Sequence, residues 1–437
     1  MDQEFEAYHF ICRNLRKLCP RLVPSTLWGL SISRIAHLAP EVGLIICDEC
    51  IEVFREIRKF WYSLTRNTLC EICGEISSEI DEEWHYYVSS SSGELVSLLS
   101  LLEMPRNELD ELLPSLRGIA YLNNFVFVCE KCHFAKHQGL ALVKGVFREA
   151  VSQLARVNNI NVSEAAKLIS IAFEIHRLLS RIDNWEFRIS EIRGISRELR
   201  SKIERVLNFM FQKGLYSEDS WIFYYKPQLA YISELRALRE TIELLRVVYE
   251  KSSVLKTSDP VWLNTLLEVI REELEPSEVI VLVNEFKYYM SLLLEEHTVK
   301  FERIVKFIAQ GDLEKALISL LYDYSYLTGK WMLFTKANSA PRLFREIINI
   351  LEERKLAYQA KITSVPSEYK NNSRTPIIIY TPSTLAPRHL VEILQVLLEI
   401  RDKYKLLENL YFKPDLFTKK NIYSRSSKIK PYIYLRY

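Results

Sequence analysis

The chain has 437 residues, of which 48% are apolar and 26% are charged. This length and composition supply enough apolar surface for two or three domains with separate cores, and they exclude an intrinsically disordered chain. The 58 Lys and Arg residues nearly balance the 56 Asp and Glu residues, for a formal net charge of +2. Any affinity for nucleic acid must therefore come from local basic patches rather than from a strong overall positive charge.

The N-terminal sequence MDQEFEAYHF is acidic and lacks the basic start, apolar run and cleavage site of a signal peptide. No stretch approaches the roughly 18 apolar residues that a membrane span needs. We therefore expect a cytoplasmic protein with no membrane partner. Six of the eight cysteines form three Cys-x-x-Cys pairs, which in such a chain indicate metal ligands before disulfides.

Residues 1–145 form the first predicted domain. They hold all eight cysteines, five of the eight histidines and the short β-type runs EEWHYYV and NFVFVC. Between these two strands, residues 89–120 have helical apolar spacing that is broken by Pro105, which predicts a helical insertion.

Helical patterns dominate from residue 146 to residue 326. They include FREAVSQLARV, then VSEAAKLISIAFEIHRLLSRI with Asn161 or Ser163 near its start, then ISRELRSKIERVLNFMFQKG. Apolar residues recur three and four positions apart, as in helices packed on a core, and we interpret His176 and His297 in the same way. We assign residues 194–326 to an α-helical linker domain.

From residue 327 to residue 437 the predicted order is strand, helix, strand, strand, helix, strand. This order is typical of a compact α+β domain with its helices on one face of the sheet. The fold class predicted for the whole chain is therefore a multidomain α+β protein.

Four cysteines have the spacing of a structural zinc site. Two residues between paired sulfurs let each pair grip one tetrahedral Zn²⁺, and no βαβ pattern indicates a redox motif instead. We predict structural zinc at Cys70, Cys73, Cys129 and Cys132. Two interpretations stay open for Cys47 and Cys50: a second zinc site together with Cys12 and Cys19, or reduced cysteines on a helix.

The stretch CEICG, the strand EEWHYY, an asparagine five residues before a cysteine, and CHFAKH together resemble the zinc-knuckle type of HNH endonuclease. The resemblance implies a ββα zinc domain in which a histidine of the first strand is the general base, an asparagine holds the loop, and later histidines bind a catalytic Mg²⁺ or similar ion. Asn124 and His133 fall on the expected positions, and His137 lies one helical turn beyond His133. The resemblance covers residues 24–193, which makes residues 146–193 a helical extension of the zinc domain.

The first strand departs from this pattern, since the chain has Asp81 where the HNH subgroup has its histidine. Asp81, Glu83 and His85 alternate onto one face of a strand. His85 is therefore the candidate for the general base, and Asp81 is the candidate for a metal ligand. If His85 is instead a surface residue, the scaffold has lost cleavage.

The segments TGKWMLF, AKITS, IIIYTPS and YFKPDLFTKKNIYSRSSKIKPYIY resemble the basophilic-leukaemia-expressed protein family over residues 326–437. The resemblance implies a fold similar to translation initiation factor 4E, with a curved antiparallel sheet backed by helices, and a nucleotide or phosphorylated ligand. Cap binding uses two tryptophans, whereas this segment has only Trp331, inside an apolar strand where a core role is favoured.

The tail of the chain interleaves basic residues with tyrosines. Basic groups can neutralise phosphates while tyrosine rings stack on bases, and the alternative is a final strand with a solvated charged face. The candidate nucleic-acid-binding residues are Lys413, Lys419, Lys420, Arg425, Lys428 and Lys430.

Three hypotheses of function follow. The first is a zinc-binding, nucleic-acid-binding protein on an HNH-like scaffold, with catalysis lost or altered. The second is an active metal-dependent HNH endonuclease acting on DNA or RNA. The third is a structural interaction protein.

Overall fold

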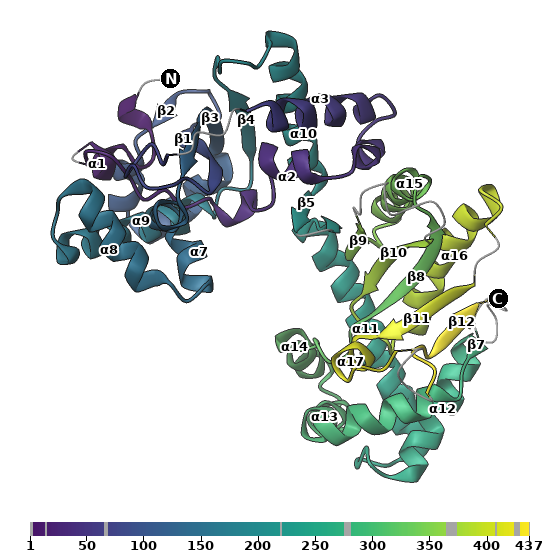
Figure 1. Ribbon diagram of the computed structural model, residues 1–437. Coiled ribbons are helices and arrows are strands. Elements are labelled where there is room, and N and C mark those ends of the chain that lie inside the picture. The colour runs from purple at the N-terminus through teal and green to yellow at the C-terminus, as the bar shows by residue number, and fades with distance from the viewer. Residues whose placement is uncertain are drawn as a thin grey trace. The chain divides into compact units, whose positions relative to one another are not determined.

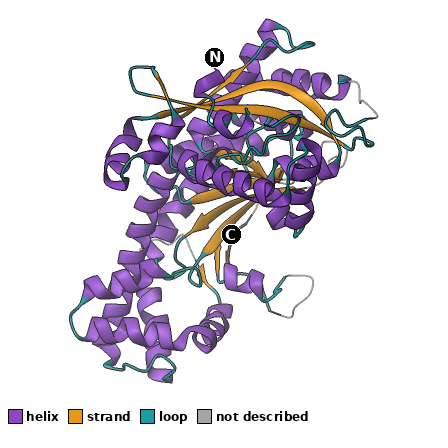
Figure 2. Cartoon of the chain, turned by 90° about the vertical axis from the view of Figure 1, so that its left-hand side faces the viewer, coloured by secondary structure: helices purple, strands orange, loops and turns teal. Residues whose placement is uncertain are grey.

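The computed structural model describes residues 3–13, 15–64, 69–218, 221–274, 281–363, 374–406, 409–423 and 429–436. Helices and strands are mixed throughout, which confirms the multidomain α+β class (Figure 2). Two compact units are present, and each is considered by itself. The first contains Met1–Pro40 and Glu49–Gln212, and the second contains Glu41–Asp48 and Lys213–Tyr437.

The first unit is built on a four-stranded sheet in the order β2-β1-β3-β4 (Figure 1). The long strands β1 (Glu79–Ser89) and β3 (Arg117–Val128) are antiparallel and form its centre. At the edges lie β2 (Leu95–Val96), and β4 (Trp185–Ile189), which is parallel to β3. The two strands predicted in this region, EEWHYYV and NFVFVC, thus pair with each other directly.

Helices pack around this sheet, and their ends follow local signals. Pro105 precedes the second helix of the stretch between β1 and β3, while the Asn161 side chain accepts a hydrogen bond from the Glu164 backbone N–H and caps the start of α9, as predicted. The α-helices are α1 (His9–Cys12), α2 (Ile32–His37), α3 (Cys50–Ser63), α4 (Leu98–Glu103), α5 (Arg106–Leu112), α6 (Glu130–Lys136), α7 (Gln138–Val143), α8 (Phe147–Asn158), α9 (Val162–Leu179) and α10 (Arg197–Lys213).

A close approach between side chain and backbone fixes β4 against β3. The indole of the buried Trp185 lies over Gly118, where an added Cβ atom would come within 2.4 Å of the ring. Any larger residue at position 118 would push β4 away from the sheet. Position 118 therefore requires glycine, which has no side chain.

The second unit contains an eight-stranded antiparallel sheet in the order β5-β6-β9-β10-β8-β11-β12-β7. Burial alternates along β8, so one face of the sheet is buried and the other is half-exposed. Trp331 is fully buried, which confirms its predicted core role. The strands are β5 (Leu215–Glu218), β6 (Trp221–Tyr224), β7 (Val281–Leu282), β8 (Gly329–Lys336), β9 (Gln359–Thr363), β10 (Arg374–Thr381), β11 (Leu410–Pro414) and β12 (Tyr434–Arg436).

The predicted order of elements after residue 327 is found as β8, α15, β9, β10, α16 and β11. The sheet nevertheless reaches beyond that segment, because β5, β6 and β7 come from residues 194–326, where only helices are predicted. These strands are two to four residues long, too short for a periodicity to stand out between long helices. The helices are α11 (Pro227–Ser252), α12 (Pro260–Leu274), α13 (Glu285–Ala309), α14 (Leu313–Tyr322), α15 (Ala340–Glu353), α16 (Pro387–Lys403) and α17 (Asp415–Lys419).

Among the residues that the structure describes, none of the helices has the length and apolar character needed to span a bilayer.

Candidate metal centre

The four cysteines predicted to bind zinc converge in the first unit. Their sulfur atoms all lie within 4.8 Å of one another. The Sγ atoms of Cys73 and Cys129 are 3.6 Å apart, close to the roughly 3.8 Å edge of a tetrahedron with metal–sulfur bonds of about 2.3 Å. This cluster, Cys70, Cys73, Cys129 and Cys132, can therefore hold a metal ion.

Local hydrogen bonds favour the thiolate of Cys70, whereas burial raises the pKa of the Cys129 and Cys132 thiols. Burial opposes ionisation of Cys70, but hydrogen bonds with the backbone of Cys129, Cys73 and Ile72 lower the pKa of its thiol to about 7. A thiolate is the form that binds a metal ion, so these backbone groups prepare the ligand.

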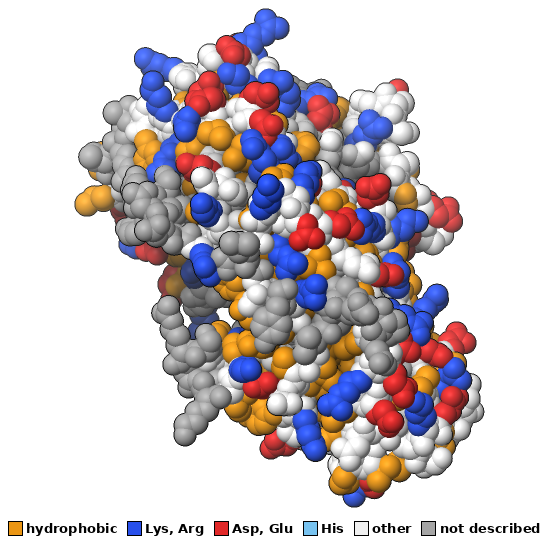
Figure 3. Space-filling model, turned by 90° about the vertical axis from the view of Figure 1, so that its right-hand side faces the viewer, with side chains coloured by type: hydrophobic (Ala, Val, Ile, Leu, Met, Phe, Trp, Pro, Cys, Tyr) orange, Lys and Arg blue, Asp and Glu red, His pale blue; other side chains and the backbone are white. Residues whose placement is uncertain are grey.

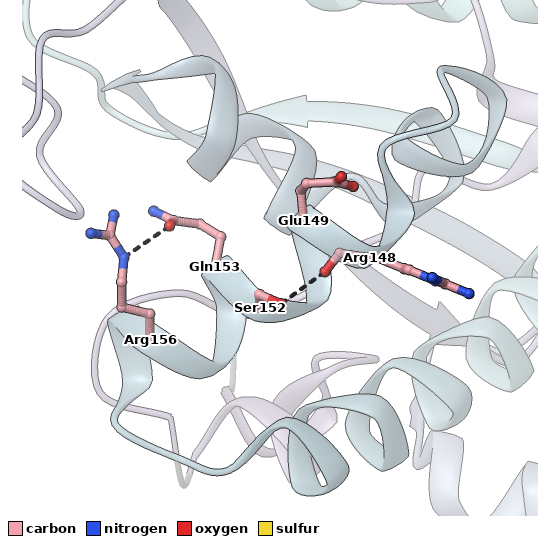
Figure 4. A pocket seen from close by; sticks show the side chains of 5 residues that line it. All are labelled: Arg148, Glu149, Ser152, Gln153 and Arg156. Atoms are coloured by element: carbon pink, nitrogen blue, oxygen red, sulfur yellow. Dashed lines mark hydrogen bonds between the residues drawn. The ribbon is translucent and has the colours of Figure 1, made fainter.

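The helix α8 supports the cysteine cluster from outside. Gln153 Nε2 lies 3.1 Å from Cys132 Sγ and donates to it. Arg156 Nε in turn donates to Gln153 Oε1, as Figure 4 shows, and its guanidinium also donates to Glu75. This chain of contacts fixes the amide so that its N–H points at the sulfur, as outer groups do around metal ligands.

The remaining four cysteines do not form a second zinc site in this structure. Cys12 and Cys19 are joined by a disulfide, and Cys47 and Cys50 are also disulfide-bonded. A sulfur in a disulfide is not a thiolate ligand. Neither the second zinc site nor the reduced thiols considered from the sequence is found.

A second group of possible ligands lies next to the cysteine cluster in the chain. Asp81, His133 and His137 have ligand atoms within 4.8 Å of one another. Asp81 Oδ1 is 3.0 Å from His137 Nε2 and 3.9 Å from His133 Nε2. Asp81 comes from β1, and β3 leads directly into α6, which carries His133 and is followed at once by His137, so a ββα arrangement brings the three together.

Two further charged residues hold these ligands in place. Glu79 Oε2 is 2.7 Å from His133 Nδ1, which orients the ring so that Nε2 faces Asp81. Lys136 Nζ donates to Asp81 Oδ2 at 2.6 Å and to the Glu82 carbonyl at 3.1 Å. One carboxylate oxygen of Asp81 is thereby occupied, and the other faces the two imidazoles.

The charges of this group follow from burial and from its neighbours. Burial alone would raise the pKa of Asp81, but Lys136 and His137 hold it well below its usual range. Burial lowers the pKa of His137 against the opposing effect of Asp81. For His133 the balance is reversed, because Glu79 and Asp81 raise its pKa despite burial. The site thus combines a carboxylate with a neutral His137 imidazole, two ligands that suit a divalent cation. His133 has to release its proton before it can bind the same ion.

The structure does not bring the other predicted site residues to this group. His85 Nε2 is 3.9 Å from Glu83, and His85 does not line the adjoining cavity. A β-bulge shifts the register between Glu83 and Trp84, and bulges re-aim the side chains that follow them. Asn124 is exposed and lies opposite Glu83 in the strand pair. The Glu83 carboxylate accepts a hydrogen bond from the side-chain amide of the neighbouring Asn123.

A cavity of about 400 Å³ adjoins the ligand group. His133 and His137 line it, and so does His176 of α9, which the sequence led us to interpret as a core residue. Burial lowers the pKa of His176, so its ring is neutral near pH 7. The sequence analysis missed the contributions of Glu79, Lys136 and His176. Glu79 lies two residues before Asp81 and Lys136 lies three residues after His133, so their proximity to predicted site residues was a signal in the sequence. His176 had no such signal.

The basic residues of the tail are dispersed. Lys413 is buried, donates to the Ile422 carbonyl, and has a pKa lowered to about 8 by burial. Lys420 pairs with Glu296, while Lys419 and Lys430 are exposed. Arg425 and Lys428 lie outside the described residues. On the face drawn in Figure 3, Lys and Arg side chains are interspersed with Asp and Glu side chains.

Comparison with known proteins places one part of the chain. Residues 287–421 match the family model of the basophilic leukemia-expressed protein Bles03. The match lies within the second unit and runs from α13 to just after α17, which supports the resemblance found in the C-terminal sequence. No curated protein and no solved structure matches the chain.

Proposed function

We propose that the first unit binds a divalent metal ion and cleaves phosphodiester bonds in DNA or RNA, on an HNH-like ββα scaffold. The observation that carries this proposal is the convergence of Asp81, His133 and His137 beside a cavity. Such a site needs a carboxylate and imidazoles with room for substrate, and all of these are found together.

In this proposal the two metal sites have different tasks. The four cysteines bind structural zinc, which ties the start of β1 to the junction of β3 and α6. Asp81, His133 and His137 hold the catalytic ion, Mg²⁺ or another divalent cation, which would stabilise the negative charge that develops on the phosphate. Glu79 and Lys136 keep these ligands oriented.

The proton acceptor is assigned to His176. The position expected for a general base is occupied by Asp81, and His85 does not line the cavity. His176 does line the cavity, and its ring is neutral. Its Nε2 lies 3.5 Å from Ser180 Oγ, and the proposal requires this nitrogen to exchange the hydroxyl for an attacking water whose proton it accepts.

A second candidate function is nucleic-acid binding without cleavage. It is favoured by the position of His85 away from the cavity and by the ammonium of Lys136 on Asp81. Binding then requires only exposed basic groups such as Lys419 and Lys430. A cytoplasmic location is proposed for both candidates.

For the second unit we propose a fold similar to initiation factor 4E and a nucleotide or phosphorylated ligand. On the half-exposed sheet face, Tyr380 lies opposite Lys330, which lies opposite Lys413. Lys361 of the next strand has its ammonium 4.5 Å from the ring centroid of Trp221. Lys330 pairs with Asp415 at 2.6 Å and Lys413 donates to the Ile422 carbonyl. Lys361 among aromatic rings is therefore the group that supports a ligand carrying both phosphate and a base.

The test is a cleavage assay on DNA and RNA with added Mg²⁺ or Mn²⁺. Product should require the metal, and His137→Ala should lower the rate by at least about a hundredfold, the range for loss of an essential catalytic group. His37→Ala, an exposed histidine outside the cavity, is the matched control. Salt-sensitive binding without cleavage would favour the second candidate, and neither binding nor cleavage would favour a structural interaction protein.

A further inference from the structure

The cavity beside Asp81, His133 and His137 is larger than a single phosphodiester group requires. Its volume of about 400 Å³ falls within the roughly 300–1,000 Å³ of sites that enclose small organic ligands. Besides the two histidines, its lining includes aromatic walls contributed by β1, β4 and α9, among them Trp84, Phe187 and Phe173. The polar site therefore adjoins a space that is lined partly by aromatic side chains.

These walls are held in place by a buried network. The Trp84 and Phe187 rings are perpendicular, with centroids 5.8 Å apart. Trp84 Nε1 donates to Glu82, whose carboxylate also accepts the backbone N–H groups of Ile32 and Ser33 at the start of α2. Because each partner fixes the next, the cavity is formed before any ligand enters.

An unpaired arginine lines the same cavity. The backbone N–H of Arg34 donates to Ser31, but its guanidinium makes no hydrogen bond or ion pair with any residue in the described ranges. A guanidinium has donors arranged to match a phosphate group in a two-bond contact. Arg34 is thus a positively charged group without an internal partner, next to a site suited to a phosphodiester.

We propose that this cavity holds one unpaired nucleotide, with its base against the aromatic walls and its phosphate bound by Arg34 beside the metal ligands. This inference rests on the proposed function for its nucleic-acid substrate. A base inside a duplex is stacked and paired and cannot enter such a pocket. The substrate class is therefore single-stranded nucleic acid, or a strand with a nucleotide freed from pairing.

The opening of the cavity supports this assignment. Trp28, which is 50% exposed, also lines the cavity. A large exposed indole at this place gives a neighbouring unpaired base a surface on which to stack. A paired and stacked base offers no free face to that ring.

Fluorescence anisotropy of labelled oligonucleotides with the full chain, without added divalent ion, tests the inference. We compare a single strand, a fully paired duplex, and a duplex with one bulged nucleotide. The single strand and the bulged duplex should bind at least about tenfold more tightly than the paired duplex. Arg34→Met should weaken single-strand binding about tenfold or more, since a charged two-bond contact is lost.

Two further variants sharpen the result. Leu140→Trp places a large side chain in the cavity while leaving Arg34 and the metal ligands in place, and it should abolish the preference for unpaired nucleotides. Arg193→Met, an exposed arginine outside the cavity, should bind as the wild type does. Thermal unfolding of each variant shows that it is folded.

Equal or tighter binding of the paired duplex by the wild type would overturn the inference, as would unchanged single-strand binding by folded Arg34→Met. Tight duplex binding together with metal-dependent cleavage would overturn this inference alone. Absence of binding to every oligonucleotide would overturn both it and the proposed function.

Discussion

Lys136 and Asp81 form a buried ion pair, although lysine and aspartate are rarely buried unless they are paired. Both residues are 6% exposed, and their charged atoms lie 2.6 Å apart. A buried carboxylate stays charged only with such a partner. The lysine therefore keeps Asp81 in the ionised form that can bind a metal ion.

Replacing Lys136 by Met should destabilise the first unit strongly. The apolar side chain keeps most of the packing but leaves the Asp81 carboxylate buried without its partner, at a cost of about 3–5 kcal/mol in the free energy of unfolding. Denaturant unfolding of the protein without added divalent ion measures it. Lys131→Met is the matched control, since its exposed pair with Glu75 should contribute at most about 1 kcal/mol. Equal losses in the two variants would contradict the role given to Lys136.

His176 is the residue whose substitution separates chemistry from binding. His176→Gln should lower kcat about 10²–10⁴-fold, the usual contribution of a general base, because glutamine cannot accept the proton. The affinity for divalent metal should stay at the wild-type value, since His176 is not one of the three proposed ligands. An unchanged kcat in steady-state assays would remove His176 from the proposed mechanism.

At the scale of elements, Glu240 of α11 makes the second unit sensitive to pH. Its carboxylate accepts the backbone N–H groups of Arg388 and His389 at the start of α16. Burial nevertheless outweighs these bonds and raises the pKa of Glu240 to about 7. The folded state therefore holds a proton on Glu240 up to a pH at which the unfolded chain has lost it.

Stability should follow from this difference. Because the pKa is raised on folding, the contribution of Glu240 is fully present below about pH 4.3 and is lost as pH rises to about 7, amounting to roughly 3 kcal/mol at most. Denaturant unfolding across this range should show the decline in the wild type and a flatter profile in Glu240→Gln, whose neutral amide does not titrate. Parallel pH profiles for the two proteins would rule out this role.

Local patterns explain which elements could be predicted. The order from β8 to β11 and the cap at Asn161 follow from periodicity and from single residues, and the cysteine cluster follows from its two-residue spacings. The bulge after Glu83 could not be predicted, because it depends on how β1 pairs with β3. The bulge accounts for the position of His85. Side-chain alternation along an unbroken strand would have put His85 on the same face as Asp81.

The cavity could not be predicted for a similar reason. It is assembled from residues distant in sequence, such as Arg34, Trp84, His176 and Phe187, and each has an ordinary interpretation on its own element. Only their convergence gives them a possible role in binding. The strands β5, β6 and β7 were also missed, since their pairing partners lie far along the chain.

At the scale of the whole molecule, the two units should unfold separately. Each has its own sheet and core, and the cysteine cluster belongs only to the first. Cys129→Ser should lower the unfolding temperature of the first unit and leave that of the second unchanged. Differential scanning calorimetry, with limited proteolysis to assign the transitions, measures both. One shared transition that moves as a whole would contradict this division.

Asp81, His133 and His137 are proposed to form a divalent metal site distinct from the cysteine cluster. Anomalous X-ray diffraction from crystals grown with Mn²⁺ tests it most directly, because manganese and zinc are distinguished by their absorption edges. We predict a zinc peak among the four cysteine sulfurs and a manganese peak between Asp81 Oδ1 and the two histidine rings, with the latter lost in His137→Ala. A zinc peak at the cysteines with no manganese at Asp81 would contradict the account.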